Sequence, residues 1–136
     1  MSNTALERER KYVLNAVKLN GLNLDYVLSE DLSGDPEIVL AAVKQNGLAL
    51  RYAPKHLKED KKFLLKAVGL NGLALKYSAE ALRDDKEVVM AAVKQNGFAL
   101  LFTSKQLKAD QELLEVACSE NIWVLDCIND HEYGYS

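Results

Sequence analysis

Hydrophobic and polar positions alternate along this chain with the spacing of amphipathic helices. In the segment that begins at Asp35, turning successive residues by about 100° places the apolar side chains on an arc of about 200°. These residues are Ile38, Val39, Leu40, Ala42 and Val43. An arc this wide is more than one partner helix could cover. The pattern therefore predicts helices that are stacked between neighbours in an array.

The same pattern recurs five times along the chain. An Asn-Gly pair ends each long apolar segment, at Asn20, Asn46, Asn71 and Asn96. The first two pairs are 26 residues apart and the later ones 25. Aspartates 25 residues apart mark the other end, at Asp35, Asp60, Asp85 and Asp110. Such periodicity is typical of repeat proteins. We expect one domain of residues 1–136, with repeats at about 9–34, 35–59, 60–84, 85–109 and 110–136.

Each repeat is expected to contain a long helix, a short helix and a helical turn. Asp is a favourable N-cap for the long helix, and Pro36 suits the first helical position. The Gly after each Asn is expected to adopt the left-handed C′ conformation that ends a helix. For the third element, Ser78 and Thr103 are the predicted N-caps and Pro54 the predicted first residue. Thr103 with Gln106 fits a capping box.

The predicted fold is therefore all-α, a short α-solenoid whose ends differ from its inner repeats. Glu9 stands where later repeats have the capping Asp, and Ile122 replaces the glycine in the last repeat. The tail of residues 129–136 departs from the pattern. Two interpretations of the tail stay open: it caps the array, or the native chain continued beyond it.

The repeated sequence also resembles a known family. The run 35–53 and its near-copy from Asp85 resemble the family catalogued as domain of unknown function 4116, over roughly residues 10–125. Repeats two and four share Ala-Ala-Val-Lys-Gln-Asn-Gly, whereas repeats one and three have Leu19 and Leu70 before Asn-Gly, in line with the paired helical repeats of that family. The resemblance implies a helical-repeat fold, often beside other domains, and little about function. An origin in a larger bacterial protein that acts inside a host cell is compatible with it.

Composition narrows the class of partner. The chain has 136 residues and a net charge of -3, which argues against a dedicated nucleic-acid surface. No apolar run approaches the roughly 18 residues of a membrane span. Two cysteines, Cys118 and Cys127, make no disulfide framework. We expect a soluble cytoplasmic protein without a membrane partner, or one of the host cytosol if it is a secreted effector.

The chain contains no combination of residues that points to catalysis. His56 and His131 have no further metal ligand at a suitable spacing, and Cys118 occupies a position that is valine in the other repeats. The row of aspartates could be interpreted as a cation ladder, but their capping role already uses the carboxylates. We predict no enzyme activity, no cofactor and no metal site.

Three rows of residues remain as candidates for binding. An aromatic row could stack bases or grip a peptide, although half-buried packing is favoured: Tyr26, Tyr52, Tyr77 and Phe102. Basic residues that include Lys44 and Lys94 could form a stripe, although interspersed acids favour a mixed solvated face. Leu19 and Leu70 lie near the edge of the exposed arc. They either pack beneath the short helices or form an apolar spot for a partner or a second copy.

The leading hypothesis is a non-catalytic helical-repeat module that mediates protein-protein interaction. Its candidate partner-binding residues are Leu19, Leu70, Lys44 and Lys94. The alternative is a structural or spacer array within a larger protein whose activity lies elsewhere. Nucleic-acid binding is a third hypothesis, disfavoured by the net charge. The pattern makes no prediction of the oligomeric state.

Overall fold

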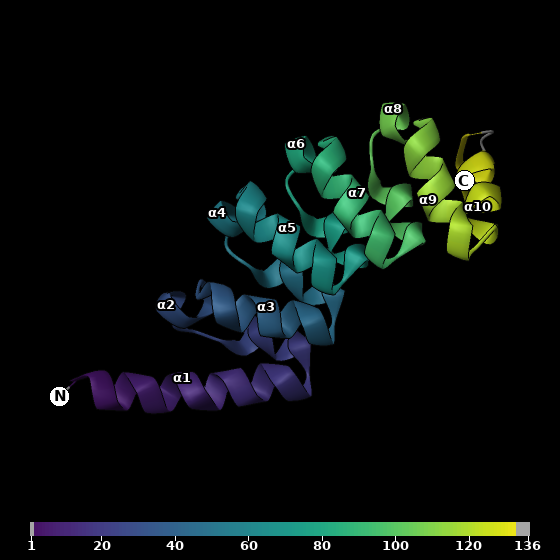
Figure 1. Cartoon of the computed structure of the whole chain (residues 1–136). Coiled ribbons are helices and arrows are strands. Elements are labelled where there is room, and N and C mark those ends of the chain that lie inside the picture. The colour runs from purple at the N-terminus through teal and green to yellow at the C-terminus, as the bar shows by residue number, and fades with distance from the viewer. Residues whose placement is uncertain (1, 133–136) are drawn as a thin grey trace.

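Five long helices lie side by side in the computed structural model, which describes residues 2–132 (Figure 1). They are α1 (Ser2–Leu19), α3 (Pro36–Gln45), α5 (Lys61–Leu70), α7 (Lys86–Gln95) and α9 (Gln111–Glu120). Each long helix packs on the one before it, and the helix axis turns steadily from α1 to α9. The described residues form helices and connecting turns without strands. The predicted all-α solenoid is confirmed.

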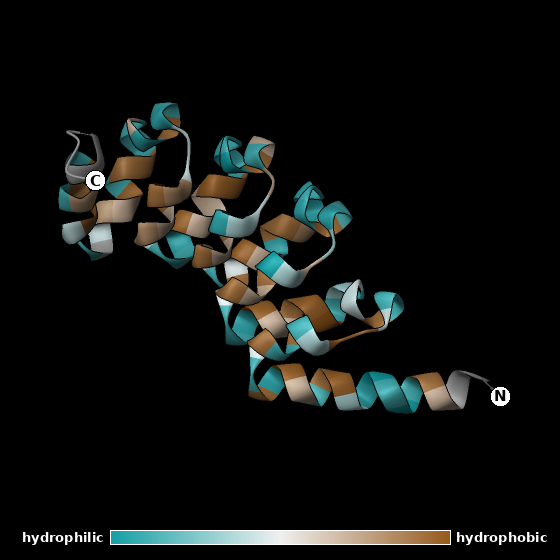
Figure 2. Ribbon diagram, turned by 180° about the vertical axis from the view of Figure 1, so that it is seen from behind, coloured by the Kyte–Doolittle hydropathy of each residue, from teal (hydrophilic) through white to brown (hydrophobic). Residues whose placement is uncertain are grey.

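The second element of the first four repeats is a 3₁₀ helix. These are η1 (Gly21–Tyr26), η2 (Gly47–Tyr52), η3 (Gly72–Tyr77) and η4 (Gly97–Phe102), and each packs on the next. In the fifth repeat the α-helix α10 (Trp123–Glu132) takes this place. Four-residue helices lead into the next repeat: α2 (Glu30–Ser33), α4 (Lys55–Lys58), α6 (Glu80–Arg83) and α8 (Lys105–Lys108). These short helices are largely hydrophilic, whereas the long helices carry hydrophobic bands (Figure 2).

The predicted caps at the start of the long helices are confirmed. Asp35 Oδ1 accepts hydrogen bonds from the backbone N–H groups of Glu37 (2.9 Å) and Ile38 (3.4 Å). Asp60, Asp85 and Asp110 cap α5, α7 and α9 in the same way. Each carboxylate thus satisfies amide groups that have no partner within the helix.

The predicted left-handed glycines are wrong. Asn46 ends α3 with an extended backbone (φ -153°, ψ 114°), and its side chain accepts a hydrogen bond from the N–H of Leu48. Asn46 is therefore the N-cap of η2, and Gly47 is the first residue of that helix. The same holds at Asn71 and Asn96. None of the glycines within residues 2–132 has a φ in the left-handed region.

These glycines instead permit the close approach of consecutive repeats. A Cβ atom on Gly72 would lie well inside 3.0 Å of the backbone oxygen of Ala92, in the long helix of the next repeat. Gly21 and Gly97 meet the corresponding carbonyls of Ala42 and Ala117 in the same way. A side chain at such a position would push neighbouring repeats apart. Ile122 replaces this glycine in the last repeat, so the approach is not repeated there.

Three predicted features of the third element are also wrong. Pro54 is the N-cap of α4 and not its first residue, and Ala79 and Ser104 precede α6 and α8. Ser78 and Thr103 are buried, and their hydroxyls donate back to carbonyl oxygens of the preceding 3₁₀ helix. Ser104 Oγ accepts from the N–H of Leu107, so no capping box forms at Thr103.

The core runs through the middle of the array and is incomplete at the first repeat. Ile38 and Val88 occupy equivalent positions in α3 and α7, and both are fully buried. Each of these helices packs between the repeat before it and the repeat after it. Tyr12 occupies the equivalent position in α1 and is 68% exposed. Helix α1 also continues through Glu9, where the first repeat was expected to begin. Of the predicted tail, residues 133–136 lie outside the described part of the chain.

Candidate functional site

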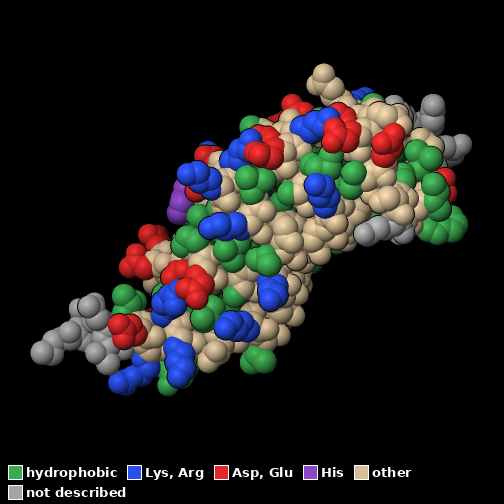
Figure 3. Space-filling model, viewed as in Figure 1, with side chains coloured by type: hydrophobic (Ala, Val, Ile, Leu, Met, Phe, Trp, Pro, Cys, Tyr) green, Lys and Arg blue, Asp and Glu red, His purple; other side chains and the backbone are tan. Residues whose placement is uncertain are grey.

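Two rows of side chains run across the outward surfaces of the long helices (Figure 3). The first row is apolar and half-buried, and consists of Leu14, Leu40, Leu65 and Met90. The second row is basic and exposed: Lys18, Lys44 and Lys94 share one position of the repeat, which is Gly69 in the third repeat, and Lys66 lies nearly one turn earlier in α5. We call the surface that contains both rows the long-helix face. About one turn of α-helix separates the two rows, so a ligand segment lying on one row is within reach of the other.

Acidic residues gather at the opposite border of this face, near the N-termini of the long helices (Figure 3). There the first residue of one helix pairs with the next repeat. Lys61 Nζ lies 3.0 Å from Asp85 and 3.1 Å from Glu87. Two equivalent clusters occur along the array: Lys86 with Asp110 and Glu112, and Arg10 with Asp35 and Glu37. The junction between the second and third repeats lacks the cluster, because Pro36 replaces the cation.

These clusters occupy three of the four carboxylates in the aspartate row, and the fourth, Asp60, caps α5 without an ion pair in the described chain. Partial burial opposes ionisation of Asp85, but the Lys61 ammonium and the N–H of Val88 outweigh it and lower the pKa of this carboxyl. The N–H of Leu113 and the ammonium of Lys86 lower the pKa of Asp110. Capping and ion pairing account for the row, and residues 2–132 contain no group of three side chains suited to a metal.

The basic row behaves differently from the cations of the ion-pair clusters. Within the described residues, none of its four lysines forms an ion pair. Lys44 and Lys94 lie in the last turns of α3 and α7. The C-terminal end of a helix dipole favours a cation there, but it provides no counter-ion. The face therefore has positive charge that is available to a ligand.

A groove of about 570 Å³ lies where α5, α7 and α9 meet on this face. Its floor is apolar and consists of Leu65, Met90 and Ala91. Lys94 lies on one border, and Lys86 with Glu87 and Glu112 lies on the other. The groove is open, so it suits a segment lying across the helices better than an enclosed small molecule.

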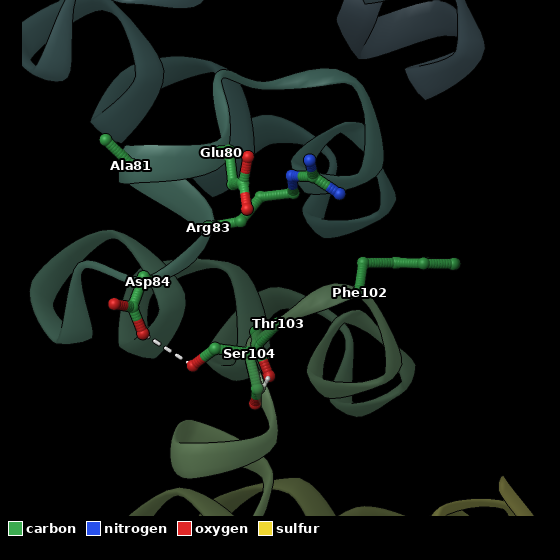
Figure 4. Close-up of a pocket in the computed structure, with 7 residues that line it drawn as sticks. All are labelled: Glu80, Ala81, Arg83, Asp84, Phe102, Thr103 and Ser104. Carbon is green, nitrogen blue, oxygen red and sulfur yellow. Dashed lines mark hydrogen bonds between the residues drawn. The ribbon is translucent and has the colours of Figure 1, made fainter.

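A second cleft, of about 510 Å³, lies between α6 and the start of α8 (Figure 4). Its polar groups make local contacts: Ser104 Oγ donates to Asp84 at 2.5 Å and also caps α8. Arg83 lies beside Glu80, and its Nε is buried without a partner among the described residues. Two carboxylates on the lining disfavour an anion here, and the single cation disfavours a metal.

A third groove, of about 460 Å³, lies on the exposed side of the first repeat. Tyr12 and Tyr26 line it with Leu28, which is 95% exposed. Inner repeats bury the equivalent surface against a neighbour. Asn23 stands where later repeats have a buried alanine, and its amide donates to the carbonyl of Ala16 at 2.9 Å. Ala16 is equivalent to Ala42, Ala92 and Ala117, whose carbonyl groups lie close to a glycine of the preceding repeat.

The structure separates the four predicted partner-binding residues. Lys44 and Lys94 lie in the basic row. Leu19 is 84% and Leu70 39% exposed, so the interpretation that they pack beneath the short helices is wrong. They lie in α1 and α5, which are separated by α3, and their role in binding a partner or a second copy stays a prediction.

The alternation of leucine and glutamine before Asn-Gly has a structural explanation. The N–H of Gly72 donates to Oε1 of Gln95 in the next repeat (2.6 Å), and Gly21 donates likewise to Gln45 (2.5 Å). Gln45 and Gln95 therefore join pairs of repeats. The predictions from sequence did not include this role, although the alternation itself was the signal.

The aromatic row is covered by cations on several of its rings. The Arg51 guanidinium lies 5.4 Å from the ring centre of Tyr52. Lys76 Nζ lies 5.7 Å from the ring centre of Tyr77 and 5.6 Å from that of Phe102. These half-buried rings pack with cations of the chain itself. The rings of Tyr52, Tyr77 and Phe102 are therefore not a free stacking platform. Tyr26 is 77% exposed, so the expectation of half-buried packing is wrong at that residue.

Fold and surface together define the class: an all-α repeat protein in which two-repeat units are joined in series. The chain belongs to the family described as Domain of unknown function (DUF4116), whose model matches it at residues 9–58, 35–83, 60–108 and 85–131. Each match spans two consecutive repeats and begins one repeat after the last. No curated protein and no solved structure matches the chain. Among the described helices, none has the length and apolar character needed to cross a membrane.

Proposed function

We propose that this chain is a non-catalytic module that binds a protein partner through the long-helix face. The observation that supports the proposal is a half-buried apolar row beside one exposed lysine in each of the first four repeats, none of which forms an ion pair within the described residues. Apolar surface beside charge without a counter-ion is typical of surfaces that recognise another molecule. The groove between α5, α7 and α9 gives this surface a concave site.

The alternative of a spacer array explains less of the surface. A spacer needs contacts between consecutive repeats, and these are present. They are the close contacts of glycines with carbonyl groups of the next repeat, the glutamine hydrogen bonds and the ion-pair clusters. None of these contacts requires unpaired lysines to align on the outward side. The spacer hypothesis therefore leaves the basic row without a role.

We place the protein in the cytoplasm of its cell, or in host cytosol if it is delivered there. Cys118 and Cys127 are both free thiols, which fits a reducing compartment. Nucleic acid is disfavoured as a partner because the net charge is -3 and the acidic clusters border the groove.

The test uses Ala91→Arg, which places a long side chain in the groove at a half-buried position where Arg is a good helix former. Ala81→Arg is the matched control, because Ala81 lies in the other cleft, on α6. Both variants and the parent chain are immobilised and exposed to an extract of the source cell. We expect proteins that the parent and Ala81→Arg retain and Ala91→Arg loses. Equal retention by all three would exclude the groove as the binding site.

A further inference from the structure

We infer that the long-helix face recognises a peptide segment that carries carboxylates next to apolar side chains. The inference rests on the proposed function and specifies its ligand. Four exposed lysines stand in successive repeats without an ion pair in the described chain, and they flank a half-buried apolar row. A segment of opposite charge with apolar side chains is complementary to both rows at once.

The two borders of the groove differ in their free charge. On one border Lys86 is already neutralised by Asp110 and Glu112, at 3.0 Å each. On the other border Lys94 is exposed and has no such partner among the side chains that the structure describes. A carboxylate of the ligand would therefore be placed on the Lys94 side. The apolar side chain beside it would contact Met90 and Leu65 on the floor.

The repeat spacing defines the length and pattern of the segment. Consecutive helix layers lie about 8–10 Å apart, and an extended chain rises about 3.3 Å per residue. One layer therefore corresponds to about three residues of an extended ligand. A segment that reaches from Lys44 past Lys66 to Lys94 crosses two layer spacings and needs about seven residues, with a carboxylate at about every third position.

A protein segment fits the groove better than a phosphate backbone does. Glu87 and Glu112 line the groove on the side opposite Lys94. A nucleic acid would bring further negative charge beside these carboxylates at every nucleotide. A peptide can present an apolar side chain there and keep its acids on the lysine side. The same argument applies to an anionic membrane surface, because its negative charge is continuous and would also lie against Glu87 and Glu112.

The experiment selects ligands from a phage library of random twelve-residue peptides on the intact 136-residue chain. Peptides are kept if Ala91→Gln, which fills the same groove position without adding charge, does not bind them, and are then synthesised with a fluorescent label. Their affinity is measured for the parent, for Lys44→Glu/Lys94→Glu and for Lys55→Glu/Lys105→Glu. The last variant is the control, because it changes net charge equally at exposed lysines of α4 and α8.

We expect enrichment of Asp and Glu beside apolar residues, and binding at least about tenfold weaker for Lys44→Glu/Lys94→Glu than for the control, with loss on raising salt. Peptides that depend on Ala91 but lack acidic residues would overturn the inference and leave the proposed function intact. The absence of any Ala91-dependent peptide would overturn both. Binding of single-stranded DNA or bulk RNA with the same lysine dependence, and tighter than any peptide, would assign the face to nucleic acid.

Discussion

Replacing Gly72 by alanine tests the way in which consecutive repeats are held together. The added Cβ would lie well inside 3.0 Å of the Ala92 carbonyl oxygen and 3.2 Å from Cβ of Asn96. The first of these atoms belongs to the backbone of α7 and cannot rotate away. Helix η3 must therefore move off α7, which also stretches the hydrogen bond from Gly72 to Gln95.

The expected loss of stability combines two destabilising contributions with one that opposes them. Overpacking of this kind costs about 1–3 kcal/mol. A weakened buried hydrogen bond adds up to about 1 kcal/mol, and the lower entropy of the unfolded chain returns about 0.4–1 kcal/mol. We expect a net loss of about 2 kcal/mol, or roughly 8 °C in Tm for a chain of this size. Urea and thermal unfolding followed by circular dichroism at 222 nm measure both quantities.

Two further variants identify the cause. Gly69 lies in α5 with no atom within 4 Å of the place that a Cβ would take, so Gly69→Ala should raise stability by about 0.5–1 kcal/mol. Gly72→Asn distinguishes two explanations for a destabilised Gly72→Ala, steric conflict with α7 and a left-handed backbone at this residue. Asparagine tolerates the left-handed region but adds more atoms than alanine, so only steric conflict predicts a loss for both variants. We expect Gly72→Asn to be at least as destabilised as Gly72→Ala. Equal stability of Gly72→Ala and Gly69→Ala would refute the reasoning.

Two other predictions concern the contacts between repeats. Gln95→Leu leaves the N–H of Gly72 without its acceptor and should cost about 1 kcal/mol in urea unfolding, whereas Gln106→Leu at an exposed position of α8 should change little. The pKa of Asp110 is lower in the folded chain than the unfolded value of about 3.9, so its contribution is complete above about pH 4 and disappears as pH falls through the folded pKa. Asp110→Asn keeps a capping side chain and should flatten the loss of stability below about pH 4; an unchanged acid profile would contradict this.

Features that depend on neighbouring residues were accessible from the sequence. The capping role of Asp35 and its equivalents follows from chemistry within three residues, and the structure has those caps. The outward positions of Lys44 and Lys94 follow from helical phase alone. The five-repeat organisation followed from spacing, since each helix is covered by copies of itself.

Features that depend on contacts between repeats were not accessible. Glycine after asparagine is common at helix ends, so a local explanation hid the approach of Gly72 to Ala92. Gln95 has the polar character of a surface residue, and its acceptor role requires the preceding repeat. Lys66 occupies the repeat position of Ala91, nearly one turn before the position of Lys94, so its place beside the basic row depends on how α5 stacks on α7.

The most direct test of the long-helix face is an NMR titration of the ¹⁵N-labelled chain with the tightest acidic peptide from the selection. We predict that the largest amide shift changes occur around Lys44 and Lys94 in the last turns of α3 and α7, and around Lys66 in the middle of α5. Shift changes that instead cluster around Ser104, in the cleft beside α6, or around Tyr12 and Leu28 would contradict the assignment of binding to this face.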